Sequence, residues 1–321
     1  MKAFLWERYG SAETAIRMAE VDKPTPGPNE VLVRVLAVSV NPADWRSMSA
    51  NPFFARFALG LLRPKHRILG GDFAGRVEAV GRGVTRFKPG DEVYGDMLDH
   101  GLGAFAEYVS APIDVLAPKP ANLSFEEAAA VPVAGVSALQ GIRQLGEIRP
   151  GQKLLVNGAS GGVGTFAVQI AKSCGAEVTG VTSTRNLDLV RSLGADHVID
   201  YTTTDFTRGE PYNFIVDTIG NRSVADLRPA LVDGGKAAVI GFTTARKLIG
   251  LLLRGGKKIR LVSAHVTASD LEVLTELIES EKVRPEIDRR YSFSEIPAAL
   301  AYLEEGHARG KVVVGLEESG G

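Results

Sequence analysis

A glycine-rich run near the middle of the chain offers the clearest chemistry. Residues Gly158 to Gly164 read GASGGVG, after the apolar stretch Lys153 to Val156 and before a helical pattern from Thr165 to Cys174. Residues with little or no side chain let the backbone bend sharply and approach a pyrophosphate, while a helix N-terminus offers N–H groups to the anion. Ala159 replaces the first glycine of the G-x-G-x-x-G pattern. The run predicts a dinucleotide-binding turn formed by Ser160, Gly161, Gly162, Val163 and Gly164, in which Gly162 faces the phosphates and Gly164 packs helix on strand.

The next strand pattern, Glu177 to Thr182, indicates which dinucleotide is bound. A site specific for NAD usually places an acidic residue at the end of this strand, where it bonds the ribose hydroxyls. The chain instead continues Ser183-Thr184-Arg185-Asn186, and a hydroxyl with a guanidinium suits a 2'-phosphate. The sequence therefore favours NADPH, bound by Ser183 and Arg185. The alternative is that Arg185 is only a solvated loop cation.

Composition limits the classes of partner. The chain has 321 residues, 45% of them hydrophobic, which is enough for two domains with cores of their own. A net charge of -1 and the absence of a long Lys/Arg run provide no electrostatic case for nucleic acid or an anionic membrane. The start, Met1 to Tyr9, shows no secretory signal, and the apolar stretch near Leu248 to Leu253 is too short to span a bilayer. A cytoplasmic protein with a small-molecule partner is expected.

Metal-binding residue types are scarce. Cys174 is the single cysteine, which excludes an intramolecular disulfide, and it is interpreted as a small packing residue on the helix after the turn. One thiol and five scattered histidines cannot form a thiolate-rich structural zinc cluster. A catalytic zinc is not expected either.

The pattern of elements changes along the chain. The first 120 residues look β-rich, with strands such as Val31 to Val40 and Gly75 to Val80. A capping box at Ser124 starts a helical stretch that breaks at Pro132, and another helix follows from about Ser137 to Leu145. Beyond it, apolar strands alternate with helical segments, which predicts an α/β fold with a parallel sheet and right-handed crossovers. The expected strands are Lys153 to Asn157, Glu177 to Thr182, His197 to Ile199, Asn213 to Asp217, Lys236 to Ile240 and Ile259 to Ser263, followed by a helix from Ser269 to Glu281 and a closing strand from Lys311 to Gly315.

Several short blocks occur along the chain in a specific order. They are Asn41 to Asp44 (NPAD), Gly70 to Gly75 (GGDFAG), Lys88 to Val93 (KPGDEV), Gly103 to Tyr108 (GAFAEY), the glycine turn, and Arg309 to Val313 (RGKVV). Together they resemble the medium-chain dehydrogenase/reductase superfamily, in its zinc-independent quinone oxidoreductase branch, which includes the zeta-crystallin-like enzymes. The resemblance implies a GroES-like β-rich catalytic domain, 1–124 and 266–321, interrupted by a doubly wound Rossmann domain for NADP(H), 125–265. Substrate would lie in the cleft between them, and the protein would be a homodimer.

The resemblance departs from the zinc-dependent relatives in an informative way. Those relatives carry an early catalytic cysteine, a Gly-His-Glu motif and a four-cysteine lobe. The matching positions here hold Asp44, Gly71 and Asp72, and no cysteine lies between Met97 and Gly103. This argues against alcohol dehydrogenase chemistry, which needs a Lewis acid on the alcohol oxygen. Without zinc the acceptor must be electron-poor already, which favours quinones and conjugated enones.

The resemblance also implies roles for single residues. Asn41 and Asp44 would line the nicotinamide side of the cleft, where Asn41 could donate a hydrogen bond, although Asn-Pro also favours a turn. Asp72 is expected to be structural, orienting backbone in the glycine-rich block. Tyr201 would meet the adenosine phosphate, with strand-end packing as the alternative. The remaining expected cofactor contacts are Gly220, Gly241 and Phe242, which follow two of the strands, and Arg309 and Lys311, which could equally be loop cations.

Two apolar segments have an undecided role. Trp45 to Arg67 either forms a wall of the substrate cleft or packs on its own domain; its apolar residues include Phe53, Phe54, Phe57, Leu59, Leu61 and Leu62. Lys247 to Leu253 would be a pocket wall or a dimer interface. The sequence as a whole predicts an NADPH-dependent, zinc-independent reductase of quinones or α,β-unsaturated carbonyls. The alternatives are an enoyl-thioester reductase and a non-catalytic NADPH-binding protein.

Overall fold

A computed structural model describes residues 1–50 and 56–317, and these divide into two compact units. The β-rich unit comprises Met1–Val133, Val266–Glu279 and the residues from Ile287 onward, and the parallel-sheet unit comprises Ala134–His265 and Ser280–Glu286. The first boundary therefore falls after Val133, whereas the sequence placed it at residue 124. The segment Ser280–Glu286 joins the parallel-sheet unit because Gln169 and Arg284 exchange two hydrogen bonds of 2.9 Å.

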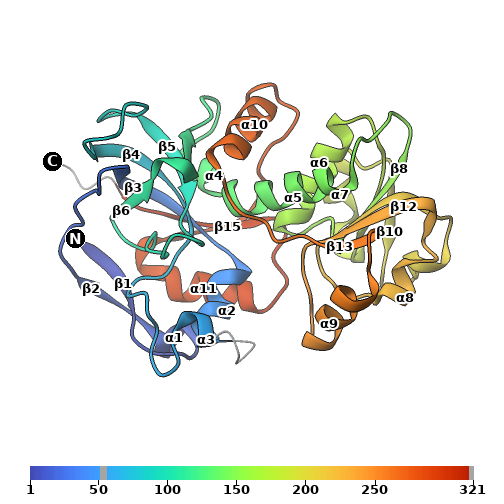
Figure 1. Ribbon diagram of the computed structural model, residues 1–321, viewed down its shortest axis with the longest axis horizontal. Coiled ribbons are helices and arrows are strands. Elements are labelled where there is room, and N and C mark those ends of the chain that lie inside the picture. Colours follow the sequence, from blue (N-terminus) through green and yellow to red (C-terminus); the bar gives the residue numbers. More distant parts are fainter. Residues whose placement is uncertain (51–55, 318–321) are drawn as a thin grey trace. The chain divides into compact units, whose positions relative to one another are not determined.

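The β-rich unit contains, within the described residues, a seven-stranded sheet in the order β14-β15-β3-β4-β5-β7, with β6 paired to β3 (Figure 1). Every pairing is antiparallel except that between β14 and β15. Large side chains such as Phe73, Tyr94 and Phe105 are fully buried and fill its core. Its strands, with the separate β1-β2 pair, are β1 (Lys2–Trp6), β2 (Ile16–Glu20), β3 (Glu30–Val40), β4 (Asp72–Val80), β5 (Glu92–Asp96), β6 (Tyr108–Pro112), β7 (Leu116–Pro118), β14 (Ile287–Ser292) and β15 (Lys311–Gly315).

Short helices connect these strands. Helix α4 begins with the predicted capping box, in which Ser124 N–H donates to Glu127 Oε2 (2.8 Å) and Glu127 N–H donates to Ser124 Oγ (3.3 Å). The helical stretch that starts at Ser124 ends before Pro132, as predicted, but helix α5 (Pro132–Leu145) begins at Pro132 itself, so the predicted start near Ser137 is wrong. Proline is well suited to the first turn of a helix, because its missing N–H has no intrahelical partner there. The other helices are α1 (Ala12–Ala15), α2 (Pro42–Ser49), α3 (Arg56–Leu59), α4 (Phe125–Ala129), α10 (Ala268–Glu279) and α11 (Ile296–Glu304), with 3-10 turns η2 (Ile113–Val115) and η5 (Phe293–Glu295).

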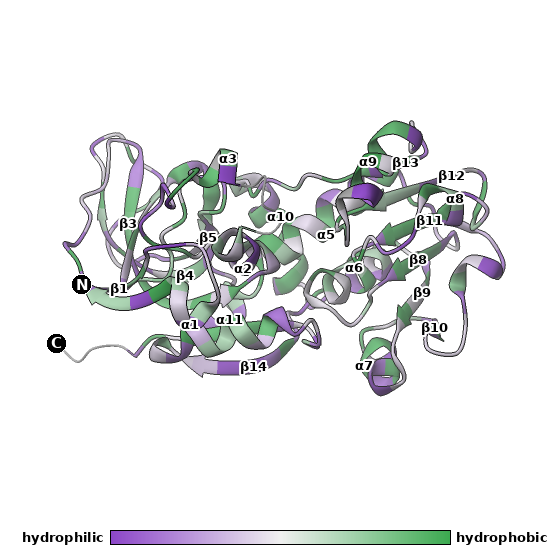
Figure 2. Ribbon diagram, turned by 90° about the horizontal axis from the view of Figure 1, so that it is seen from below, coloured by the Kyte–Doolittle hydropathy of each residue, from purple (hydrophilic) through white to green (hydrophobic). Residues whose placement is uncertain are grey.

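The parallel-sheet unit has the predicted doubly wound α/β fold. Over the described residues its six strands lie in the order β10-β9-β8-β11-β12-β13, and every pair is parallel. Figure 2 shows the strong hydrophobic colouring of the central strands, as expected for a sheet buried on both faces. The elements are β8 (Lys153–Asn157), α6 (Gly162–Ser173), β9 (Glu177–Thr182), η3 (Thr184–Asn186), α7 (Leu187–Ser192), β10 (His197–Asp200), η4 (Phe206–Arg208), β11 (Tyr212–Asp217), α8 (Val224–Leu227), β12 (Leu231–Val239), α9 (Ala245–Arg254) and β13 (Ile259–Leu261).

Two further observations concern single elements. Cys174 is the C-cap residue of α6, and it is exposed. The expectation that it is a packing residue is therefore wrong. The helix ends one residue earlier than the apolar periodicity suggests, which leaves Cys174 outside the packed face. Across the residues that the structure describes, no helix combines the length and apolar character needed to cross a membrane.

Candidate functional site

The glycine turn lies at the topological switch point of the parallel sheet. Strand β8 has β9 on one side and β11 on the other, and ligands of such sheets bind where the strand order reverses. Gly158 adopts a φ of +83°, which favours glycine, and the N–H groups of Gly158 and Ala159 donate to Val181 O (3.1 and 3.0 Å). A Cβ on Gly164 would lie 2.0 Å from Gly158 O. Gly164 therefore permits the close approach of helix to strand that the sequence predicts.

The start of helix α6 is open to an anion. Gly161 occupies its N-cap position, and because glycine has no side chain it supplies no capping bond. The N–H groups of the first turn, which includes Gly162, Val163 and Gly164, are the groups that bind phosphate at such helix ends. A Cβ on Gly161 would make only an ordinary contact, 3.5 Å from Gly158 O. A Cβ at Gly161 would therefore clash with nothing in the fold.

The carboxyl ends of β8, β9 and β10 bring together the residues predicted at the adenosine end. Ser160 Oγ accepts hydrogen bonds from Thr182 Oγ1 (2.7 Å) and Asn186 Nδ2 (3.1 Å), and Asn186 Nδ2 also lies 3.4 Å from Ser183 Oγ. Arg185 is exposed on the 3-10 turn that follows β9. Tyr201 N–H donates to Thr182 O (3.0 Å), but its side chain is 58% exposed, which does not fit the strand-end packing alternative.

An acidic residue that the sequence argument missed lies at the same edge. Thr184 Oγ1 donates to Asp200 Oδ2 (2.5 Å), and the N–H and hydroxyl of Thr202 donate to Asp200 Oδ1 (2.9 and 2.7 Å). These hydrogen bonds lower the pKa of Asp200, and the bond from Thr184 has the largest effect. An ionised carboxylate therefore lies beside Thr184, next in the chain to Arg185. The sequence argument considered an acid only at the end of β9, whereas this one comes from the end of β10.

The strand ends on the other side of the switch point are held by buried polar bonds. Asp217 Oδ1 accepts from Asn157 Nδ2 (2.8 Å) and from the N–H of Gly220 (2.9 Å), so β8 and β11 are joined at the turn. Gly220 has a φ of +64°, and a Cβ there would lie 2.0 Å from Gly241 O. The two predicted glycines thus constrain each other's backbone. Gly220, Gly241 and Phe242 line one small pocket of this unit, and their contact with a cofactor stays a prediction.

A second constellation is buried in the β-rich unit. Asp72, at the start of β4, accepts from Ser39 Oγ (2.7 Å), Asn41 Nδ2 (2.8 Å) and Lys311 Nζ (3.2 Å) through one oxygen, and from Val133 N–H (2.9 Å) through the other. Lys311 Nζ also donates to Asn41 Oδ1 (2.5 Å). Lys311 opens β15 and is 3% exposed, so the loop-cation alternative is wrong for this residue. Asp72 has the structural role expected of it, because it fixes two strands and the start of α5.

Two more carboxyl groups are buried near this pair. Asp44 Oδ2 accepts from Asn41 N–H (2.7 Å), and Asp96 Oδ1 accepts from Leu98 N–H (2.8 Å). The other oxygen of each carboxyl is buried and has no hydrogen-bond partner among the described residues. Burial raises the pKa of Asp44 to about 7, and burial together with the charge of Asp72 raises the pKa of Asp96 well above its usual range.

Nearby charges add to the effect of burial on these carboxyl groups. Among the residues of this cluster that the structure describes, one ammonium faces three carboxyl groups, and an unpaired charge is costly to bury. Lys311 and Asp72 form the ion pair, while burial raises the pKa values of Asp44 and Asp96. Sequence reasoning selected Asn41 and Asp44 but missed Ser39 and Asp96. The signal in the sequence that could have revealed Asp96 is its place directly after the apolar run Val93 to Gly95.

Comparison with known proteins decides the family. Residues 27–121 match the alcohol dehydrogenase GroES-like domain, and residues 193–314 match a family described as zinc-binding dehydrogenase. A chloroplastic quinone-oxidoreductase of Triphysaria versicolor is 34% identical over 331 residues, which cover 98% of each protein. The chain belongs to the medium-chain dehydrogenase/reductase superfamily, in its quinone oxidoreductase branch. It is an oxidoreductase that uses a nicotinamide cofactor.

Two further comparisons agree with this membership. The 2-methylene-furan-3-one reductase of Solanum lycopersicum is 34% identical over 325 residues, covering 98% of this chain and 79% of that protein. The solved structure of the quinone oxidoreductase from Coxiella burnetii is 30% identical, covers 99% of both chains and superposes with a TM-score of 0.89.

Potential metal ligands are not grouped in the described part of this oxidoreductase. No group of three or more His, Cys, Asp or Glu residues within residues 1–50 and 56–317 is arranged to hold a metal ion. The cation that pairs with Asp72 is the Lys311 ammonium, 3.2 Å from Asp72 Oδ2. Zinc independence of the reaction stays a prediction.

The remaining predicted residues have mixed outcomes. Arg309 lies at the surface, where its N–H donates to Asp288 Oδ2 (3.0 Å) and its guanidinium lies 3.8 Å from Asp288 Oδ1. Cofactor contacts of Arg309 and Lys311 stay predictions. In the apolar segment Trp45 to Arg67, Phe53 and Phe54 lie outside the described residues. Trp45 and Leu59 pack on the core of their own unit, as one of the two alternatives expects, whereas Phe57, Leu61 and Leu62 are strongly exposed.

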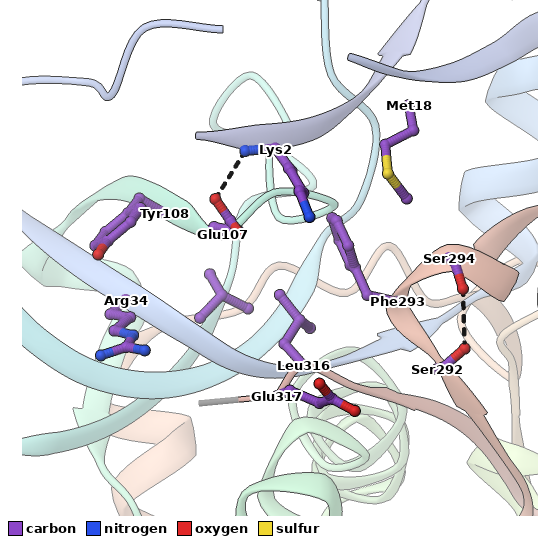
Figure 3. A pocket seen from close by; sticks show the side chains of 12 residues that line it. Lys2, Met18, Arg34, Glu107, Tyr108, Ser292, Phe293, Ser294, Leu316 and Glu317 are labelled. Carbon is purple, nitrogen blue, oxygen red and sulfur yellow. Dashed lines mark hydrogen bonds between the residues drawn. The ribbon is translucent and has the colours of Figure 1, made fainter. Parts of the chain in front are cut away.

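The β-rich unit also contains a pocket of about 620 Å³ (Figure 3). Met18, Phe293 and Leu316 form its apolar part, and Lys2 N–H donates to Glu107 Oε2 (2.7 Å) at its edge. In the part of the chain that the structure describes, this pocket is lined by residues other than the predicted site residues. It therefore contributes nothing to the assignment of the site.

Proposed function

We propose that this oxidoreductase transfers hydride from NADPH to a quinone or an α,β-unsaturated carbonyl compound without zinc. The observation that carries the proposal is the glycine turn at the switch point, where Gly164 packs helix on strand and Gly161 leaves the helix N-terminus uncapped. This geometry fits a pyrophosphate, because backbone N–H groups and the helix dipole both favour an anion.

The residues around the turn would hold the cofactor as follows. N–H groups of Gly162, Val163 and Gly164 would bind the pyrophosphate, with Ser160 fixed beside them by its bonds to Thr182 and Asn186. Ser183 and Arg185, at the end of β9, would bind the 2'-phosphate. When bound, the cofactor supplies a hydride from its nicotinamide ring.

The buried cluster of the β-rich unit supports a role for Asn41 and Asp44 near the substrate. Asn41 is held rigidly, because its amide bonds both Asp72 and Lys311. A quinone or enone that accepts hydride becomes an anion and then takes a proton. Asp44, whose pKa is raised to about 7, is a carboxyl group that can carry that proton at neutral pH.

The acceptor class follows from chemistry and from the relatives. Quinones and conjugated carbonyls are polarised already, so hydride addition needs positioning and no Lewis acid. The names of the two relatives, a quinone-oxidoreductase and a 2-methylene-furan-3-one reductase, describe these two acceptor classes. A homodimer remains part of the proposal, supported by the exposed apolar residues of α9 beside the edge strand β13.

The first experiment tests cofactor choice by titrating NADPH and NADH into the parent and two variants. Arg185→Ala should weaken NADPH binding by about 1.5 to 3 kcal/mol, which is roughly tenfold to a hundredfold, and barely affect NADH. Asp200→Asn is the matched variant, since it removes the negative charge at the same edge and should improve NADPH binding. Equal losses for both cofactors in Arg185→Ala, or a parent that prefers NADH, would contradict the proposed specificity.

The second experiment tests the acceptor class by following NADPH oxidation with quinones, enones and enoyl thioesters. Turnover of quinones or enones is expected, and it should persist after exhaustive chelation. Turnover of thioesters alone would assign the chain to the alternative reductase class. Absence of turnover with every class, or stoichiometric zinc with chelator-sensitive turnover, would overturn the proposal.

A further inference from the structure

An exposed apolar tip projects from the β-rich unit at helix α3 and the turn after it. We define the tip as Phe57, Leu61 and Leu62, which are 74%, 58% and 88% exposed. Figure 2 shows hydrophobic ribbon at α3 beside strongly hydrophilic colouring. Single exposed apolar residues are normal on protein surfaces, but three within six residues form a contiguous feature that needs an explanation.

The fold holds this tip in place. Tyr9 Oη donates to Gly60 O (2.5 Å), and Lys65 N–H donates to Leu59 O (2.8 Å), which closes the turn. Trp6 N–H donates to Arg67 O (2.7 Å), so the segment returns to the body of the unit. Gly60 has a φ of +120°, and a Cβ there would lie 2.1 Å from Arg63 O. The turn is thus built to a specific geometry while Leu61 and Leu62 point to solvent.

The charged residues of the chain segment that carries the tip have one sign. No acidic residue occurs between Asp44 and Asp72 in the sequence, a stretch of mixed apolar and basic residues. Arg63, Lys65 and Arg67 follow the tip directly and are exposed. The formal net charge of -1 is a sum over the whole chain, so it does not reveal the local excess of basic residues in this segment. A basic rim around an apolar tip complements an anionic interface with an apolar interior.

We propose that the apolar tip docks on the surface of an anionic lipid bilayer. Phe57, Leu61 and Leu62 would enter the boundary between head groups and acyl chains, while Arg63, Lys65 and Arg67 would pair with anionic head groups. The proposal departs from the expectation, drawn from total charge, that the chain has no membrane partner. If the proposed function holds, docking would bring the enzyme to lipid-dissolved quinones, but the binding itself is independent of that function.

The test is co-sedimentation of the full chain with vesicles of phosphatidylcholine alone and with added phosphatidylglycerol. The parent should bind the anionic vesicles, and binding should weaken at high salt. Leu62→Asp should lose about tenfold or more in vesicle affinity, because a charge replaces an apolar side chain that the bilayer would bury. Met18→Asp is the matched control, since Met18 is also an exposed apolar residue of this unit, 38% exposed, and should bind like the parent.

A second pair of variants tests the charges and leaves the tip intact. Arg63→Gln with Lys65→Gln should lose most binding to anionic vesicles, whereas Arg82→Gln with Lys88→Gln, two exposed cations elsewhere on the unit, should not. The proposal fails if the parent ignores both vesicle types, or if each variant binds like its control. It also fails if Leu62→Asp lowers the molar mass measured by light scattering but leaves vesicle binding unchanged, because the tip would then contact a second copy of the chain. NADPH oxidation is not used, so failure here leaves the proposed function untouched.

Discussion

Replacing Asp44 by asparagine should change how the stability of the β-rich unit depends on pH. The pKa of Asp44 is raised by burial from its ordinary value of 3.8 to about 7. The folded protein therefore keeps this proton up to about pH 7, while the unfolded chain releases it near pH 3.8. Folding takes up a proton between these values, so the stabilising contribution is fully present below the lower one and is lost as pH rises through the upper one.

The size of the effect follows from the two pKa values. One pH unit corresponds to 1.36 kcal/mol for one proton, so the interval from 3.8 to about 7 corresponds to about 4 kcal/mol. The amide of the Asp44→Asn variant cannot titrate, and its oxygen can still accept from Asn41 N–H. Relative to Asp44→Asn, the parent should lose up to about 4 kcal/mol of unfolding free energy between about pH 4 and pH 7, and the difference should level off above about pH 8.

Urea unfolding of the cofactor-free proteins at a series of pH values measures this difference. The two tryptophans of the chain, Trp6 and Trp45, both belong to the β-rich unit, so tryptophan fluorescence follows that unit selectively. Asp22→Asn, which removes an exposed carboxylate from the same unit, is the control. Parallel pH profiles for the parent and Asp44→Asn would show that Asp44 does not hold its proton in the fold, and the argument from burial would be refuted.

The remaining predictions concern the ion pair and the turn. Lys311→Met should cost about 3 to 5 kcal/mol of unfolding free energy in the same fluorescence assay, because it leaves Asp72 buried without its cation. Adding Asp72→Asn should recover part of that loss, and simple additivity of the two substitutions would contradict the pairing. Gly164→Ala should lower the cofactor-free melting temperature, since its Cβ would lie 2.0 Å from Gly158 O, with a cost of about 1 to 3 kcal/mol or more. Gly161→Ala, whose Cβ meets nothing closer than 3.5 Å, should melt like the parent and yet bind NADPH poorly; parent-like affinity would show that Gly161 does not face the phosphates.

Local signals in the sequence predicted most strands of the parallel-sheet unit, although β12 begins at Leu231, five residues before the predicted start at Lys236. The predicted strand Glu177 to Thr182 is β9 residue for residue, and the turn after β8 has the geometry that its glycines predict. Such features depend on residues within about a dozen positions of one another, so periodicity and turn chemistry reveal them. The capping box at Ser124 was predictable for the same reason.

Three features depend on contacts between residues far apart in the sequence and could not be predicted from local patterns. The bond between Lys311 and Asn41 joins residues 270 positions apart, so no local pattern could show that this lysine is buried. Asp200 reaches Thr184 only because β10 pairs with β9. The boundary after Val133 reflects the packing of α4 on β3 and β4, and composition alone does not change there.

Residue types and their spacings were enough to predict the family, the fold class and the glycine turn of this protein. The ionisation of its carboxyl groups and the exposure of its apolar residues became known only from the folded chain. The pKa of Asp44 depends on how completely water is excluded and on which charges lie nearby, and both arise from strands that meet in the sheet. The exposure of Leu62 likewise depends on the turn that Gly60 and Tyr9 hold in place. The sequence alone does not show whether such an apolar residue will be buried or exposed.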